Sequence, residues 1–141
     1  MTPKEHLLRV KVYFDLIRDT KMEIEILNSQ LDGMSGMGYD KELVQTSLAD
    51  TRIENQLILI EQKEKRLASF RKKYRQARRE VSFRISGLKN ERERKVLTLR
   101  YLRFMEWRDI FVEMKETQDI VFQIHKRALN HYPVDMTELD R

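Results

Sequence analysis

The sequence predicts an all-α protein, a long N-terminal antiparallel helical hairpin followed by a C-terminal helix-turn-helix module. Its 141 residues contain only four Gly and two Pro, too few for the many tight turns of an all-β sandwich or barrel. With 36% charged and 40% apolar residues, the chain favours long helices that bury narrow apolar stripes. Apolar residues also recur at spacings of three and four, which is the period of a helix packed along one face.

The first helix begins at a capping box, because Thr2 and Glu5 stand three residues apart and Pro3 occupies the first helical position. The apolar seam that follows is Val10, Tyr13, Ile17, Thr20, Ile24, Leu27 and Leu31. We expect the helix to end near Leu31, since three glycines follow and predict a loop at 32–40. Their G-x-x-G-x-G pattern has the wrong spacing for a nucleotide-binding loop, so it is interpreted as a connection between two helices.

A second helix, capped by Asp40, meets no Gly or Pro until Gly87, although an interruption within 70–80 is an alternative. Its seam is Ile53, Leu57, Ile60, Leu67, Tyr74 and Val81. Aligned at the loop, it should outrun the first helix by roughly 17 residues from near Phe70, at about 1.5 Å per residue. Residues 1–79 are therefore predicted to form a coiled-coil-like hairpin. Such a hairpin buries little alone, which favours a homodimer or packing on the C-terminal module.

Residues 80–132 carry the signals of three short helices, followed by a tail at 133–141. Gly87 suits a left-handed residue after a helix end, and Asn90 with Glu93 supplies an N-cap signal. Thr117 is the predicted N-cap of the last helix, which Tyr132-Pro133 should end. Helical spacing places four residues of this module in its core, Trp107, Ile110, Val121 and Ile124.

Positive charge is concentrated in the middle of the chain. Residues 61–103 hold 16 basic and 5 acidic side chains, whereas residues 1–60 hold 7 and 10, and residues 104–141 hold 5 and 8. Such a block is typical either of a face that binds a polyanion or of an ordinary solvated helix surface.

Several functional classes are poorly supported. The chain has no Cys, and His125 and His131 lie on different helix faces with no third ligand nearby, so no metal or other cofactor is expected. His125 is instead interpreted as a surface or phosphate-contacting residue, and Glu93 as a capping residue. There is no nucleophile–base constellation, which argues against an enzyme. No signal peptide or apolar run long enough to span a membrane is present, so a cytoplasmic protein is expected.

The stretch Ile85-Ser86-Gly87-Leu88-Lys89-Asn90-Glu91-Arg92-Glu93-Arg94-Lys95-Val96-Leu97-Thr98-Leu99-Arg100-Tyr101 resembles the opening of region 4 of bacterial sigma factors. Trp107-Arg108-Asp109-Ile110 and Ile124-His125-Lys126-Arg127-Ala128-Leu129 continue the likeness. Together with the N-terminal hairpin, the chain is similar to small phage transcriptional regulators of Gram-positive bacteria, grouped near the ArpU and RinA late regulators.

This resemblance implies that the helix starting at Thr117 enters the major groove of DNA. The implied base-reading residues are Gln118, Asp119, Phe122, Gln123 and Lys126. Gln123 suits adenine and Asp119 suits cytosine, whereas Phe122 could contact a thymine methyl or pack on the hairpin. The candidate phosphate contacts are Thr117, Arg78, Arg79, Arg92, Arg94, Lys95 and Arg100.

The leading hypothesis is therefore a sequence-specific double-stranded DNA-binding transcriptional regulator, a homodimer in the cytoplasm of a bacterial host. The alternative is a protein–protein interaction module that binds host RNA polymerase through the hairpin or the region 4-like domain, without DNA specificity of its own.

Overall fold

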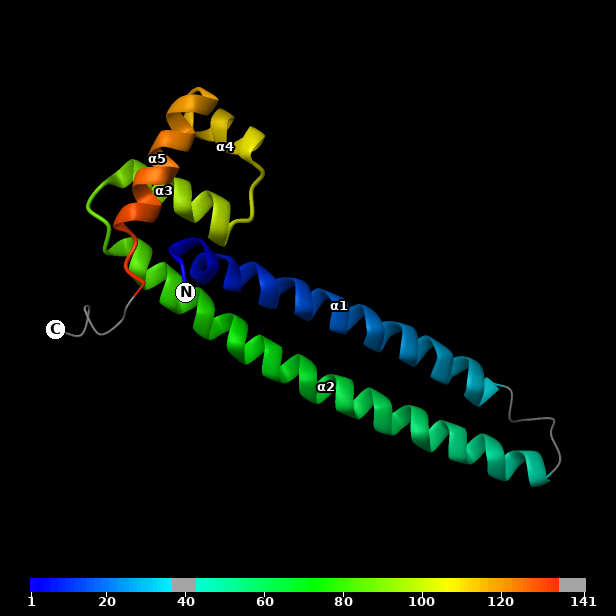
Figure 1. Cartoon of the computed structure of the whole chain (residues 1–141). Coiled ribbons are helices and arrows are strands. Elements are labelled where there is room, and N and C mark those ends of the chain that lie inside the picture. The colour runs from blue at the N-terminus through cyan, green and yellow to red at the C-terminus, as the bar shows by residue number, and fades with distance from the viewer. Residues whose placement is uncertain (37–42, 135–141) are drawn as a thin grey trace. The chain divides into compact units, whose positions relative to one another are not determined.

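The computed structural model describes residues 1–36 and 43–134 of the chain. Within these residues every regular element is helical and there is no strand, which confirms the predicted all-α class (Figure 1). The elements are α1 (Pro3–Gly36), α2 (Leu43–Ser86), α3 (Glu91–Leu97), the π-helix η1 (Thr98–Leu102), α4 (Trp107–Met114) and α5 (Gln118–His131). The chain divides into two compact units. One joins Met1–Phe14 to the chain from Lys73 onward, and the other is Asp15–Lys72.

The first unit has a continuous apolar core. α3 packs against α5, and α4 packs against both α5 and η1. The buried side chains come from the first turns of α1, the end of α2 and the helices that follow, among them Leu7, Val10, Val81, Val96, Leu97, Ile110, Val121 and Ile124. The predicted burial of Ile110, Val121 and Ile124 is confirmed, whereas Trp107 is only partly buried at the edge of this core.

The start of α1 packs on the end of α2 through this core. The capping box predicted there is confirmed, because Glu5 N donates to Thr2 Oγ1 at 3.2 Å and Thr2 N donates to Glu5 Oε2 at 3.1 Å. Leu7 and Val10 belong to the same buried cluster as Val81. The predicted overhang of the second helix is therefore wrong. It assumed that the two helices align at the loop, whereas contacts at the opposite end decide the register.

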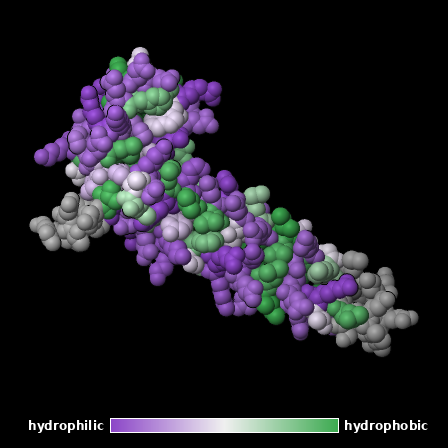
Figure 2. Space-filling view, in the orientation of Figure 1, coloured by the Kyte–Doolittle hydropathy of each residue, from purple (hydrophilic) through white to green (hydrophobic). Residues whose placement is uncertain are grey.

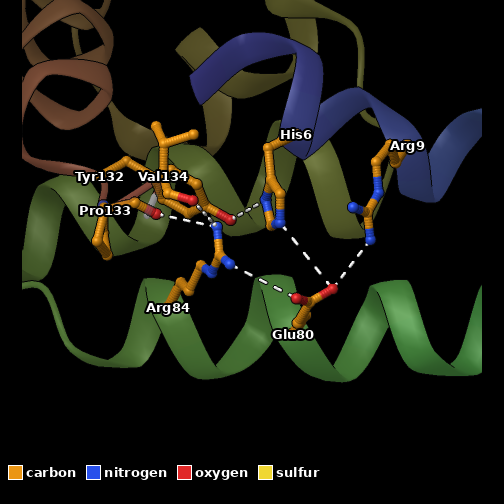
Figure 3. A network of polar contacts seen from close by, with 7 residues as sticks. All are labelled: His6, Arg9, Glu80, Arg84, Tyr132, Pro133 and Val134. Atoms are coloured by element: carbon orange, nitrogen blue, oxygen red, sulfur yellow. Dashed lines mark hydrogen bonds and ion pairs between the residues drawn. The ribbon is translucent and has the colours of Figure 1, made fainter. Parts of the chain in front are cut away.

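Polar side chains hold the segment after α5 against α2 (Figure 3). Arg84 is only 3% exposed and donates from Nη1 to the carbonyls of Pro133 and Val134 at 3.2 and 3.0 Å. Its Nη2 lies 3.5 Å from Glu80 Oε1, and the other carboxylate oxygen accepts from Arg9 Nη2 of α1 at 2.9 Å. A buried guanidinium needs such partners, since an unpaired buried charge is strongly destabilising.

His6 completes this network as a neutral group. Its Nδ1 lies 2.7 Å from the Tyr132 hydroxyl (Figure 3). Burial, followed by the charges of Arg84 and Arg9, lowers the pKa of His6 to about 4 against a smaller opposing effect of Glu80. Burial also raises the pKa of Tyr132 well above its usual value. At pH 7 the contact is therefore a hydrogen bond between two uncharged side chains.

The second unit is an antiparallel pair of helices that buries little (Figure 1). Lys63 Nζ lies 2.7 Å from Glu23 Oε2, and this hydrogen bond lowers the pKa of Glu23. Gln56 Nε2 donates to the Leu27 carbonyl at 3.1 Å. The buried side chains in the described part of this unit are Thr20, Ile60 and Leu67, and each keeps between 5 and 9% of its surface exposed.

Much of the apolar surface of this unit faces solvent. Leu57 was predicted to lie in the seam, but it is 49% exposed, and Gln56 takes the inward position instead. Apolar side chains accordingly interrupt the polar surface along the hairpin (Figure 2). The exposed ones in this unit are Met22, Ile26, Leu48, Leu57, Ile58 and Leu59.

The helix ends differ from the prediction in two places. α1 continues to Gly36 rather than ending near Leu31, so the start of the predicted loop at 32–40 is helical. The predicted cap Asp40 lies outside the described residues. α2 runs without interruption to Ser86, and Gly87 does not take a left-handed conformation. Its N–H donates to the Arg84 carbonyl at 3.2 Å, so the helix ends by tightening its last turn.

Candidate nucleic-acid interface

The helix α5 presents one edge to solvent. The five predicted base-reading side chains are all exposed, Gln118, Asp119, Phe122, Gln123 and Lys126. Spacings of one, three and four place them on the same edge of the helix. The other side of α5, formed by Val121, Ile124 and Ala128, is buried in the core of the first unit. The core therefore holds this helix without covering the edge.

Three residues connect α4 to α5. Lys115 has a left-handed conformation, with φ 55° and ψ 41°, and Glu116 N donates to the Phe111 carbonyl at 3.2 Å, which ends α4. So short a connection is that of a helix-turn-helix. Thr117 occupies the predicted N-cap position, but its side chain makes no capping hydrogen bond. Thr117 is exposed, and the first backbone N–H groups of α5 that follow it can stabilise an anion.

Phe122 packs on α4, and within the described part of the chain none of its ring contacts is with the N-terminal hairpin. Its ring meets the ring of Trp107 at 84° with centroids 5.1 Å apart, and that of Phe111 at 77° with centroids 5.5 Å apart. These are edge-to-face contacts, the arrangement that aromatic pairs favour. The side chain is nevertheless 38% exposed. Phe122 is therefore part of the exposed edge and of the packing between the two helices.

His125 is not the surface or phosphate-contacting residue that the sequence predicted. Its Nε2 lies 2.8 Å from the Tyr101 hydroxyl, and its ring centroid lies 4.7 Å from that of Trp107. Burial lowers the pKa of His125 to about 4, with smaller effects of Lys4 and Arg100. The imidazole is therefore neutral at pH 7 and offers no charge to a phosphate. Helical spacing alone did not indicate this, because the residue sits at the margin between the buried and exposed faces.

Two of the predicted phosphate contacts remain available to a ligand. Arg79 and Lys95 are exposed, and neither has an ion pair or hydrogen bond within the described part of the chain. Arg92 is also exposed, but it forms an ion pair with Glu116 at the end of the α4–α5 turn. A phosphate would have to compete with that carboxylate for the guanidinium.

The other three arginines proposed for phosphate serve the fold. Arg78 donates from Nη1 to the Leu102 carbonyl at 2.9 Å, and Arg94 donates to the Leu88 carbonyl. Arg100 donates to the Met105 carbonyl at 2.9 Å, and its guanidinium lies 4.9 Å from the centroid of the Trp107 ring. These guanidinium groups satisfy backbone carbonyls at helix ends and connections. A count of basic residues does not separate such structural arginines from free ones.

A basic concave surface lies along the end of α2, α3 and η1. Two open hollows of about 550 and 610 Å³ share Ser82, Ser86 and Leu102 in their walls. Their basic residues are Arg75, Arg78, Arg79, Arg94, Lys95 and Arg103. Phe83, 62% exposed, lines the first hollow. Neither Arg103 nor Phe83 was predicted from the sequence. A signal was present for the α2 side, since residues 75, 79, 82 and 86 recur at helical spacing.

Glu93 and His131 form a pair that the capping interpretation missed. Asn90 Oδ1 accepts from the backbone N–H groups of Arg92 and Glu93, which confirms Asn90 as the N-cap of α3. The Glu93 side chain, however, is buried and both of its carboxylate oxygens lie 3.0 Å from His131 Nδ1. The pair joins α3 to the last turn of α5, so it positions α5 rather than binding a metal.

Comparisons with protein-family models, with curated proteins and with solved structures find no match to this chain. Among the described residues, no group of three or more potential ligands is placed to hold a metal ion. None of the described helices is long and apolar enough to cross a membrane.

Proposed function

We propose that this protein binds double-stranded DNA sequence-specifically and regulates transcription, with α5 entering the major groove. The observation that carries the proposal is the exposed edge of α5, where Gln118, Asp119, Gln123 and Lys126 are free of the core that holds the helix. A major groove admits an α-helix, and side chains of this kind read base edges. The three-residue turn before α5 is the geometry in which a second helix is presented to a groove.

The chemistry of the edge suggests what is read. The Gln123 amide can form two hydrogen bonds to adenine, and the Asp119 carboxylate can accept from the amino group of cytosine. Lys126 lies one turn beyond Phe122 and can donate to guanine or to a phosphate. On the resemblance to phage late regulators, we propose that this activity serves late-gene control of a phage or prophage in the cytoplasm of a bacterial host.

Phosphate binding is assigned to cations that the fold does not use. Arg79 and Lys95 are exposed and without partners in the described chain, and the Thr117 hydroxyl lies at the positive end of α5. If about five phosphates are neutralised by each protomer, the logarithm of affinity falls with the logarithm of salt concentration with a slope of roughly −4 to −5.

The DNA-binding form is proposed to be a homodimer joined through the second unit. Four consecutive apolar residues, Leu57–Ile60, cover the whole circumference of α2, yet only Ile60 is buried within the chain. A helix that is apolar all round is stable when other helices surround it. A second copy offers the same exposed surface, including Ile26 of α1, and closed two-fold pairing is the commonest arrangement of soluble oligomers.

The proposal is tested by selecting duplexes from random DNA with the purified protein and measuring binding by fluorescence anisotropy. Gln123→Ala should weaken binding to the selected duplex about tenfold or more and leave a scrambled duplex unaffected. Arg79→Ala combined with Lys95→Ala should weaken both duplexes alike and reduce the salt slope by about two. The control pair Lys65→Ala and Arg66→Ala also removes two exposed cations, from the second unit, and should change neither. Failure to enrich any sequence would contradict the proposal.

A second candidate function is binding to bacterial RNA polymerase, and the concave basic surface favours it. An exposed Phe83 in one hollow with Arg75 and Arg79, and Arg103 in the adjoining hollow, suit an acidic, partly apolar segment of a protein partner. A pull-down with the polymerase separates the two functions. Phe83→Asp should abolish capture in this case, whereas Val112→Asp, on the equally exposed surface of α4, should not.

A further inference from the structure

Phe122 is the one aromatic side chain on the exposed edge of α5. It lies one turn from Gln118 and from Lys126, and next to Gln123. Its exposed fraction of 38% leaves apolar surface among groups that hydrogen-bond to water. Single exposed apolar residues are ordinary on protein surfaces. What distinguishes this one is its position within an edge proposed to enter DNA and the way in which its ring is held.

Aromatic side chains of α4 hold the ring of Phe122 in place. Trp107 and Phe111 of α4 both meet it edge-to-face. Trp107 in turn contacts the Arg100 guanidinium, which lies over its ring, and the ring of His125, which is nearly perpendicular to it. His125 is fixed by its contact with the Tyr101 hydroxyl. The exposed part of the ring is therefore presented in a fixed orientation, so little side-chain entropy is lost when a ligand covers it.

In the major groove of DNA the apolar group available to such a ring is the C5-methyl of thymine. We infer that Phe122 is a specificity-determining residue, which packs on the C5-methyl of one thymine in each half-site. The inference rests on the proposed DNA-binding function, and it names the base, thymine, and the group of that base that Phe122 contacts. The polar neighbours on the edge read hydrogen-bonding groups, whereas Phe122 distinguishes thymine from a base that lacks the methyl.

Deoxyuridine tests this directly, because it pairs like thymidine and lacks only that methyl. Each thymidine of the selected duplex is replaced in turn, and the affinity is measured by fluorescence anisotropy. For the natural protein we expect one position per half-site at which the replacement weakens binding about fivefold, as expected for one buried methyl group. At the other positions the replacement should have little effect.

The variant Phe122→Ala should bind the thymidine and deoxyuridine duplexes equally at that position. Because the comparison is made within one variant, a general loss of affinity or stability does not disturb it. The matched control is Ile120→Ala, which truncates another 38%-exposed apolar residue of α5 that lies off the edge, and it should keep the fivefold preference.

Two results would overturn the inference while the proposed function stands. One is a natural protein that recognises its selected duplex but is indifferent to every deoxyuridine replacement. The other is a Phe122→Ala variant that keeps the full preference for thymidine. Failure to select any duplex would overturn the proposed function, and this inference with it.

Discussion

The two compact units of this chain bury apolar residues to very different extents. The first unit, Met1–Phe14 with the chain from Lys73 onward, encloses a continuous core to which every one of its helices contributes. In the second, Asp15–Lys72, the buried side chains of the described part are Thr20, Ile60 and Leu67, none of them fully buried, and apolar residues such as Ile58 face solvent. A core on one side of α5 is therefore enough to hold the exposed edge of that helix rigid. The two paired helices of the second unit, by contrast, leave apolar surface that a partner can cover.

The largest expected effect comes from a matched pair of core truncations, which tests the difference in burial between the two units. Leu97 is fully buried in the first unit, and Leu67 is among the few buried residues of the second. Leu97→Ala should lower the free energy of unfolding by about 2–5 kcal/mol, because it leaves a cavity that dense packing cannot close. Leu67→Ala should cost less than half as much, since water and neighbouring side chains can fill the space. Urea denaturation followed by circular dichroism measures both, and equal losses would contradict the difference between the units.

Low pH should affect the stability of the first unit, because all three histidines of the chain lie there. The pKa values of His6 and His125 are about 4 in the folded protein, below the ordinary value of 6.5. Between these values the unfolded chain binds more protons than the folded one, so stability falls as pH decreases from about 6.5 to 4. The slope is at most about 1.4 kcal/mol per pH unit for each imidazole.

Urea denaturation at pH 7, 6 and 5 measures this effect. The double variant His6→Gln and His125→Gln keeps polar groups at both positions and should flatten the dependence on pH. An unchanged acid sensitivity in that variant would show that carboxylates, rather than these two imidazoles, are responsible.

The smallest expected effect concerns the second unit. Ile58→Glu places a charge on its exposed apolar surface and should weaken the proposed dimer about tenfold or more, since a buried unpaired charge opposes association. Gln62→Glu, on an exposed position one turn away, is the control and should leave the dimer intact. Sedimentation equilibrium measures both constants. A natural protein that is monomeric at every concentration would contradict the assignment of this surface to a second copy.

Structural features that depend on residues close together in the sequence were predicted well. The capping box of Thr2 and Glu5, the N-cap Asn90, and the two ends of α5 depend on residues within one or two turns, so they could be read directly. The exposure of the candidate edge of α5 was also predictable, because Val121 and Ile124 mark the opposite face.

Contacts between distant segments were not predicted. The register of α1 on α2, the exposure of Leu57 and the pairing of the buried Glu93 with His131 all depend on which helix meets which. The same holds for the arginines, because Arg78 finds the carbonyl of Leu102 only once the chain has folded back. Charge and spacing are the same for a structural arginine and a free one.

The amino-acid pattern is enough to predict the all-α class, the positions of the short helices and the polar edge of α5, because helix periodicity and capping act over a few residues. The packing of the helices sets which cations are free for a ligand, makes His125 neutral, and holds Phe122 against Trp107 and Phe111 while part of its ring faces solvent. These properties depend on burial and on partners far along the chain, and both arise only when the helices pack.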